Sequence, residues 1–436
     1  MRSSEAIRRY ANGSIWVIPG IAAVLALIVG WVLSTIAIEP DSWLDPILFQ
    51  GTADDARIML IDVTSTVVTV IALVLGLTVV ALQLSSTQFS PRLLRGFIRD
   101  RPTQIALSIF TATFAYCAAG LYTVGVSDGS RVETYPRLAV SMALVLLFVT
   151  LATVVVFADH LVNSIQIDVM TGRVEKESLQ LVGDWLGYAE APSPEPPSRA
   201  VPVPAQRSGY VQLVRIADIL PALETSGLTV RIVPRVGEHV VAGLPLAWVW
   251  HETDPDVRVE TAAVAHALRK AVRIGQERTP EQDVAFGIRQ LVDVACKALS
   301  PAVNDPYTAV QAVDHLTIVF CAMVTRPLGD QVAPAAGGRG LIIVPGRRFR
   351  DYLSQMCGLI RRYGAAEPTV MIALLRLLTR CALLADRDRR RETILHQADL
   401  ILQAATRAVV EPADLETVRV AAERVRLAVS GDLRAG

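Results

Sequence analysis

Residues 62–94 read DVTSTVVTVIALVLGLTVVALQLSSTQFSPRLL, and this stretch decides the fold class. No charged residue lies between Asp62 and Arg92, so the stretch is long and apolar enough to cross a bilayer as one helix. It is not uniformly apolar, however. At 100° per residue, a band about 100° wide collects polar and small residues together with two apolar ones. The members of this band are Asp62, Ser65, Thr66, Thr69, Leu73, Gly76, Val80, Gln83 and Thr87.

We define the polar stripe as seven of these residues, and it has two interpretations. They are Asp62, Thr66, Thr69, Leu73, Gly76, Val80 and Gln83. Hydrocarbon cannot solvate Asp or Gln, so the stripe should face protein or water. One interpretation is a helix–helix contact face built from small and hydroxyl side chains. The other is a water-exposed, pore-lining face, and the sequence leaves both open.

Three further apolar runs without a charged side chain are long enough to span a bilayer, which takes about 20 residues. They cover residues 15–38, 103–126 and 138–158, and residues 63–84 of the quoted stretch make the fourth. Hydrophobic residues make up 52% of the 436-residue chain and are concentrated in its first 158 positions. The first run is longer than the apolar part of a signal peptide, so we expect it to stay as an anchor. The sequence predicts an α-helical membrane protein with a four-span domain over residues 1–160.

The arginines predict how these spans are oriented. Arginines precede the first span, whereas acidic residues follow it between positions 39 and 55. A second group, which includes Arg92, Arg95 and Arg99, lies between the second and third spans. Because cytoplasmic loops carry an excess of positive residues, we expect both termini and this basic loop to be cytoplasmic.

The basic loop also carries an amphipathic pattern over residues 91–100. Its apolar residues share one helical face, and Arg92, Arg95 and Arg99 share the other. Ser90 and Pro91 suit the start of a helix. The pattern predicts a helix in the inner membrane–water interface, with the arginines towards lipid headgroups. The alternative is a simple charge cluster that stops transfer of the preceding span.

After the fourth span we predict a cytoplasmic α+β region. Residues 161–190 predict a helical extension, the Pro-rich residues 191–207 an extended linker, and residues 208–252 a small β module. Residues 253–436 predict a mostly helical domain. Its expected features include a helix over 257–277, a helix that begins at the capping box Thr279-Pro280-Glu281-Gln282, and a lone strand at 341–345.

The β module is similar in its glycine spacing to the barrel-sandwich units of biotinyl and lipoyl carriers. Those carriers need a modified lysine at a hairpin tip, and no lysine lies between Lys176 and Lys270. The six histidines include no H-x-x-x-H pair, and the chain has no Walker, GxGxxG or G-x-S-x-G string. We therefore expect no cofactor and no metal site, and an enzyme is not favoured. A formal net charge of zero gives no case for binding nucleic acid.

A rigid corner is predicted at residues 300–306, where two prolines enclose Asn304 and Asp305 between two apolar helices. Side-chain oxygens of Ser300, Asn304 and Asp305 have two possible uses there. They can cap the following helix, with Asp305 as N-cap and Pro306 as the first helical residue. They can instead hold a ligand, and the sequence leaves this alternative open.

Three strings together resemble one family. They are QLSSTQFSPRLLRGFIRDRPTQ at 83–104, SGYVQ at 208–212, and DVAFGIRQLVDVACKALSPAVNDPYTA at 283–309. The chain resembles the bacterial predicted integral membrane proteins catalogued as domain of unknown function 2254, with four spans, a β module and helices in that order. The resemblance implies a bacterial inner-membrane location. It brings no established activity and no catalytic residues.

Two classes of function are therefore expected. In the first, the protein is a homo-oligomeric ion channel or conduit whose second spans line an axis and whose cytoplasmic domain regulates it. In the second, it is a non-conducting membrane sensor or scaffold whose cytoplasmic domain binds a ligand or protein partner. The polar stripe favours the first class.

Overall fold

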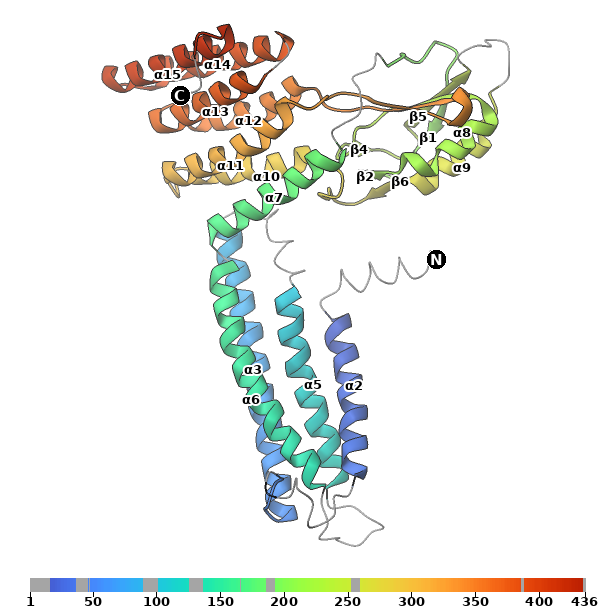
Figure 1. The fold of residues 1–436 in the computed structure, drawn as a ribbon, viewed down its shortest axis with the longest axis vertical. Coiled ribbons are helices and arrows are strands. Elements are labelled where there is room, and N and C mark those ends of the chain that lie inside the picture. Colours follow the sequence, from blue (N-terminus) through green and yellow to red (C-terminus); the bar gives the residue numbers. More distant parts are fainter. Residues whose placement is uncertain are drawn as a thin grey trace. The chain divides into compact units, whose positions relative to one another are not determined.

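The computed structural model describes residues 16–36, 46, 48–88, 101–124, 136–164, 166–185, 193–251, 259–385 and 388–433. The chain divides into two compact units, Met1–Met170 and Thr171–Gly436. Each unit has its own fold, and both are drawn in Figure 1.

The first unit consists of long apolar helices. They are α2 (Val17–Thr35), α3 (Ala53–Gln88), α5 (Arg101–Thr123) and α6 (Arg137–Ser164). Each is long and apolar enough to cross a membrane, which confirms the four predicted spans. The helix that carries the polar stripe begins ten residues before the predicted span. Thr52 explains this start, because its Oγ1 accepts from the Asp55 N–H and its own N–H donates to the Asp55 carboxylate.

Helix α5 packs against α2, α3 and α6. Its approach to α2 is close, since a Cβ built on Gly30 would lie 3.0 Å from the Ala119 Cβ. Two hydrogen bonds join α5 to α6: the buried Thr113 and Thr150 hydroxyls lie 3.1 Å apart, and the Tyr116 hydroxyl donates to the Ala139 carbonyl. Small residues and interhelical hydrogen bonds of this kind are typical of packing within membranes.

The second unit contains two small sheets, which confirms the predicted α+β region. One sheet has the order β1 (Val201–Pro204), β5 (Pro245–His251), β3 (Leu228–Ile232), β8 (Leu341–Val344) and β7 (Gln331–Pro334). The other has the order β4 (His239–Val240), β2 (Gly209–Val214) and β6 (Val272–Gly275). Helices α8 (Leu220–Ser226) and α9 (Ala262–Ala271) lie beside the sheets in Figure 1, and two short 3-10 turns, η2 (Ile216–Asp218) and η3 (Ala336–Gly338), complete this part.

Three strands differ from the sequence-based expectation. Strand β1 lies in the stretch that we predicted as a linker, and β6 lies in the stretch that we predicted as a helix over 257–277. Strand β8 is not alone, because it pairs in parallel with β3 and antiparallel with β7. Each of these strands is four residues long and pairs with a strand far away along the chain, and β8 pairs in addition with the nearby β7. Such pairing is decided by tertiary packing rather than by local pattern.

The other helices of the second unit are α7 (Ile167–Trp185), α10 (Val284–Ala298), α11 (Pro306–Val324), α12 (Phe349–Tyr363), α13 (Pro368–Leu384), α14 (Asp388–Ala408) and α15 (Pro412–Ser430). Helices α10–α15 form one end of the unit in Figure 1. Helix α11 is also long and apolar enough to span a membrane. It packs against α10 and α13 with Leu316 and Phe320 fully buried, so core packing accounts for its apolar composition.

The predicted capping box at Thr279 is wrong. Helix α10 begins at Val284, and Asp283 is its N-cap, since the Asp283 carboxylate accepts from the Phe286 N–H at 3.1 Å. Arg278 donates twice to the other carboxylate oxygen of Asp283. The Thr279 Oγ1 is buried and has no hydrogen-bond partner among the described residues. The buried Asp283, paired with Arg278, is therefore the N-cap that the local sequence pattern had assigned to Thr279.

Candidate functional site: the polar stripe of helix α3

The polar stripe lies on the outside of its own helix bundle. All seven of its residues are exposed in the first unit. Its two apolar members show that the stripe does not contact other helices of the same protomer, because Leu73 is 56% exposed and Val80 is 51% exposed. A stripe that served as a contact face within the protomer would be covered by α5 or α6.

A different face of α3 makes the contact with the bundle. Its buried residues are Ala56, Leu60, Val63, Val67, Val74 and Ala81. At 100° per residue this face is centred about 130° away from the polar stripe. On the other side of the stripe lies an exposed apolar arc, which we call the lipid arc. It consists of Ile61, Val68, Leu75 and Val79.

The stripe therefore occupies its own sector between a packed face and an apolar face. Gly76 leaves an opening in it, because a Cβ built there would meet no atom within 4 Å. The Thr69 hydroxyl donates to the Ser65 carbonyl at 2.9 Å, an intrahelical bond that lets a threonine lie in an apolar environment. Asp and Gln side chains such as Asp62 and Gln83 are more polar, and on a membrane-spanning helix they are expected to face protein or water.

The interfacial helix predicted at 91–100, with Arg92, Arg95 and Arg99, lies outside the described residues. Its interpretation stays a prediction. The same holds for the arginines that precede the first span.

The corner at residues 300–306 is held by local hydrogen bonds. The Asp305 carboxylate accepts from the Thr308 N–H at 3.1 Å and from the Thr308 hydroxyl at 2.6 Å. These two bonds lower the pKa of Asp305 below its ordinary value of 3.8, the hydroxyl being the larger cause. The Ser300 hydroxyl donates to the Lys297 carbonyl at 2.7 Å. Asn304 has a φ of +49°, the left-handed conformation that Asn tolerates better than most residues.

The structure thus brings Ser300, Asn304 and Asp305 into one turn and uses two of the three side chains within the turn itself. Asp305 is the N-cap of α11 with Pro306 in the first turn, as predicted. This geometry favours a structural use of the corner over a ligand site. The described residues of the chain contain no cluster of three His, Cys, Asp or Glu side chains suited to a metal ion.

A protein family with a known sequence pattern also matches this chain of four apolar helices and an α+β region. The family described as "Predicted membrane protein (DUF2254)" matches residues 12–380. The chain belongs to this family. It is a membrane protein with several transmembrane helices, and the family gives no specific function.

Among curated proteins, this DUF2254 chain is similar to mycobacterial ones. It is 41% identical over 427 residues to "Uncharacterized protein Rv1290c" of Mycobacterium tuberculosis (strain ATCC 25618 / H37Rv), covering 96% of this chain and 81% of the relative. "Uncharacterized protein Mb1321c" of Mycobacterium bovis shows the same identity and coverage. No solved structure matches the chain significantly.

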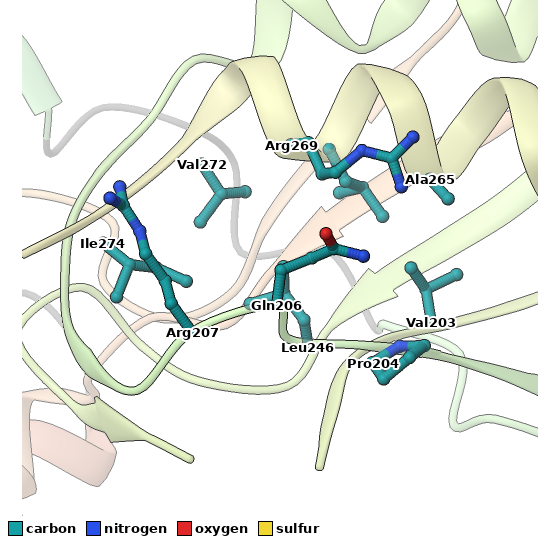
Figure 2. A pocket seen from close by; sticks show the side chains of 10 residues that line it. Val203, Pro204, Gln206, Arg207, Leu246, Ala265, Arg269, Val272 and Ile274 are labelled. Carbon is teal, nitrogen blue, oxygen red and sulfur yellow. The ribbon is translucent and has the colours of Figure 1, made fainter. Parts of the chain in front are cut away.

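The structure also shows two cavities in the second unit that sequence reasoning missed. One, of about 220 Å³, lies in the β module and is drawn in Figure 2. Its polar residues Gln206, Arg207 and Arg269 come from separate segments, so no local motif signals it. The other, of about 70 Å³, is lined by residues that include Arg235, Asp283 and Arg347. Because these three charges already face charged partners in Glu238 and Arg278, the smaller cavity belongs to a structural ion-pair network.

Proposed function

We propose that this DUF2254 protein is a homo-oligomeric ion channel or conduit of the bacterial inner membrane, with the α3 helices of several copies around an axis. One observation carries the proposal: the polar stripe is exposed on its own protomer. Polar and ionisable side chains on a membrane-spanning helix are expected to face protein or water, so a stripe that ends in Asp62 and Gln83 is expected to do the same. Contact with other copies around a water-filled central path satisfies this requirement.

The spacing along α3 supports the same arrangement. Asp62 and Gln83 are 21 residues apart, which corresponds to about 32 Å of helix and so to the thickness of the hydrocarbon core. The acid and the amide would therefore lie at the two membrane–water boundaries. Thr66 and Thr69 follow Asp62 towards the centre, and Leu73 and Val80 supply the apolar positions.

In such an assembly each residue of the stripe has a role. A ring of Asp62 carboxylates favours cations at one mouth. Hydroxyls of Thr66 and Thr69 replace part of an ion's hydration shell. Leu73 and Val80 form a narrow apolar zone that closes by dewetting. Gly76 permits close approach of neighbouring helices, and Gln83 lines the second mouth.

We further propose that both termini are cytoplasmic, so that the second unit lies in the cytoplasm and Asp62 at the periplasmic mouth. The support is the arginine asymmetry of the sequence, because basic residues precede the first span and occupy the loop between the second and third. The second unit would then be the regulatory part of the channel.

Conductance of the purified protein in planar bilayers tests the proposal. Leu73→Ser should produce a leak current, because a hydroxyl wets the apolar zone, and Asp62→Asn should weaken the preference for cations. Leu75→Ser, on the lipid arc two residues away, is the matched control and should leave the current unchanged. The channel is contradicted if the wild type and Leu73→Ser are both silent, or if Leu75→Ser leaks as much as Leu73→Ser.

The second candidate function is a non-conducting sensor, favoured by the cavity in the β module. In this case the polar stripe packs copies together without a water path. Silent bilayers together with a stable oligomer and a ligand bound in the cavity would distinguish the sensor from the channel.

A further inference from the structure

The larger cavity of the second unit has the make-up of a binding site for a small organic ligand. It lies between the loop that joins β1 to β2, helix α9, and strands β5 and β6. Its volume is about 220 Å³. For comparison, an engineered apolar cavity of about 150 Å³ takes up benzene. The cavity therefore has room for one compact ring and a small acidic group.

The inner lining of the cavity is apolar. Leu246, Leu268, Val272 and Ile274 are all buried. These side chains belong to the hydrophobic core of the β module, which keeps the lining in place without a ligand. Binding pockets for small molecules are commonly of this kind, with an apolar lining and a few placed polar groups.

The polar groups of the cavity are all on its rim, and its charges are all positive. Figure 2 shows the Gln206 side chain between those of Arg207 and Arg269. All three residues are exposed, and no acidic residue lines the cavity. Two guanidinium groups and an amide beside an apolar cavity suit an anion whose apolar body enters the cavity.

Three other arginines of this region each have an acidic partner. Arg215 pairs with Asp218, Arg231 with Asp330, and Arg273 with Glu281. Neither Arg207 nor Arg269 forms an ion pair with a residue that the structure describes. Their charges are therefore available to an external anion.

We propose that this cavity binds a small organic anion, a carboxylate or phosphate monoester carried on a compact apolar body. Arg207 and Arg269 hold the acid group, Gln206 donates to it, and the apolar body packs on Leu268 and Ile274. The proposal stands on the geometry of the second unit alone. It does not depend on conduction through α3, and it gives the sensor alternative its class of ligand.

Titration calorimetry on the full-length protein in lipid nanodiscs, with empty nanodiscs as the blank, tests the site. The probes are benzoate, phenyl phosphate, neutral benzamide and cationic benzylamine. At least one anion should bind, and benzamide and benzylamine should bind about tenfold more weakly or not at all, because they lack the charge that the arginines complement. Binding of benzoate but not of phenyl phosphate identifies a carboxylate site. Binding of phenyl phosphate but not of benzoate identifies a phosphate monoester site.

Variants assign the binding to this cavity. Arg207→Gln and Arg269→Gln should each weaken the binding of the anion about tenfold. Arg339→Gln removes an exposed arginine outside the cavity and should leave the affinity unchanged. Ala265→Phe should fill the cavity and abolish binding, and its thermal unfolding midpoint reports whether the variant is folded. The proposal is overturned if neither anion binds, if benzamide binds as tightly as the anions, or if Arg339→Gln weakens binding as much as the rim variants.

Discussion

At the scale of single residues, Gly237 shows how the buried Asp283 carboxylate, paired with Arg278, restricts the residue beside it. Gly237 has a φ of +85°, and a Cβ built on it would lie 2.0 Å from the Asp283 carboxylate. That carboxylate caps α10 and accepts both bonds from Arg278. Burial raises the pKa of Asp283, while the Arg278 guanidinium opposes the rise. Only glycine leaves room for this pair.

We therefore expect Gly237→Ala to destabilise the protein more than Gly243→Ala does. Gly243 has a similar φ of +87°, but a Cβ there meets no atom within 4 Å. Gly243→Ala should cost about 1–2 kcal/mol for the left-handed backbone alone. Gly237→Ala should cost roughly 1–3 kcal/mol more, because it also displaces the carboxylate. Urea unfolding of the full-length protein in detergent measures both, and equal losses would contradict the role assigned to the pair.

The corner before α11 gives a second prediction at this scale. Asp305→Ala should cost about 1 kcal/mol at neutral pH by removing the cap, and Asp305→Asn should cost less. Asn304→Gly should be tolerated, whereas Asn304→Ala should cost about 1 kcal/mol because of its left-handed backbone.

The pH dependence of the Asp305 cap has a definite sign. The folded-state pKa of Asp305 is lowered from 3.8, so the carboxylate stabilises the fold at pH values above 3.8. This contribution is lost as the pH falls through the lowered pKa. The difference in unfolding free energy between wild type and Asp305→Ala should therefore shrink in strong acid. A difference that grows below pH 3.8 would contradict the cap.

At the scale of elements, helix α7 docks onto the helical part of the second unit. Its buried residues Thr171, Val174, Ser178 and Val182 lie along one face. Glu175 and His315 of α11 lie 2.6 Å apart, and Ser178 faces Gly287 of α10. These contacts hold α7 against α10 and α11 within the second unit.

Gly287→Ala should loosen the α7 docking. The added Cβ would lie 2.1 Å from the buried Ser178 Oγ, so the variant should lose roughly 1–3 kcal/mol. The double variant with Ser178→Ala removes that oxygen and should recover most of the loss. Gly358→Ala on α12 is the control, because a Cβ there meets no atom within 4 Å, and it should gain up to about 1 kcal/mol. Denaturant unfolding measures the free energy of unfolding of each variant. A double variant as unstable as Gly287→Ala would contradict this contact.

The four apolar helices and most helices of the second unit could be predicted, because length, hydropathy and 3.6-residue periodicity are local properties. Strand β8 could also be predicted, at 341–345, but its pairing with the distant strand β3 could not. Strands β1 and β6 could not, since their partners lie far along the chain. The polar stripe followed from periodicity within one helix. Its exposure did not, because that depends on where α5 and α6 pack on α3. The cavity around Arg207 and Arg269 likewise exists only after folding brings separate segments together.

At the scale of the whole molecule, topology is the first quantity to establish. A reporter that is active only outside the cytoplasm should be on when fused after Asp45 or Asp128. It should be off when fused after Arg99 or Gly436, because the arginine-rich segments stay inside. Activity at the C-terminal fusion would contradict a cytoplasmic second unit.

Disulfide cross-linking between copies in native membranes tests the central claim, that the polar stripes of several protomers face one another. Leu73→Cys is on the stripe and Leu75→Cys on the lipid arc, and both leucine side chains are exposed in the protomer, by 56% and 37%. Wild type sets the background, since its five cysteines are buried or half-buried. After oxidation with iodine, the account predicts disulfide-linked dimers for Leu73→Cys above that background and none for Leu75→Cys. Dimers for Leu75→Cys without any for Leu73→Cys, or background levels for both, would contradict it.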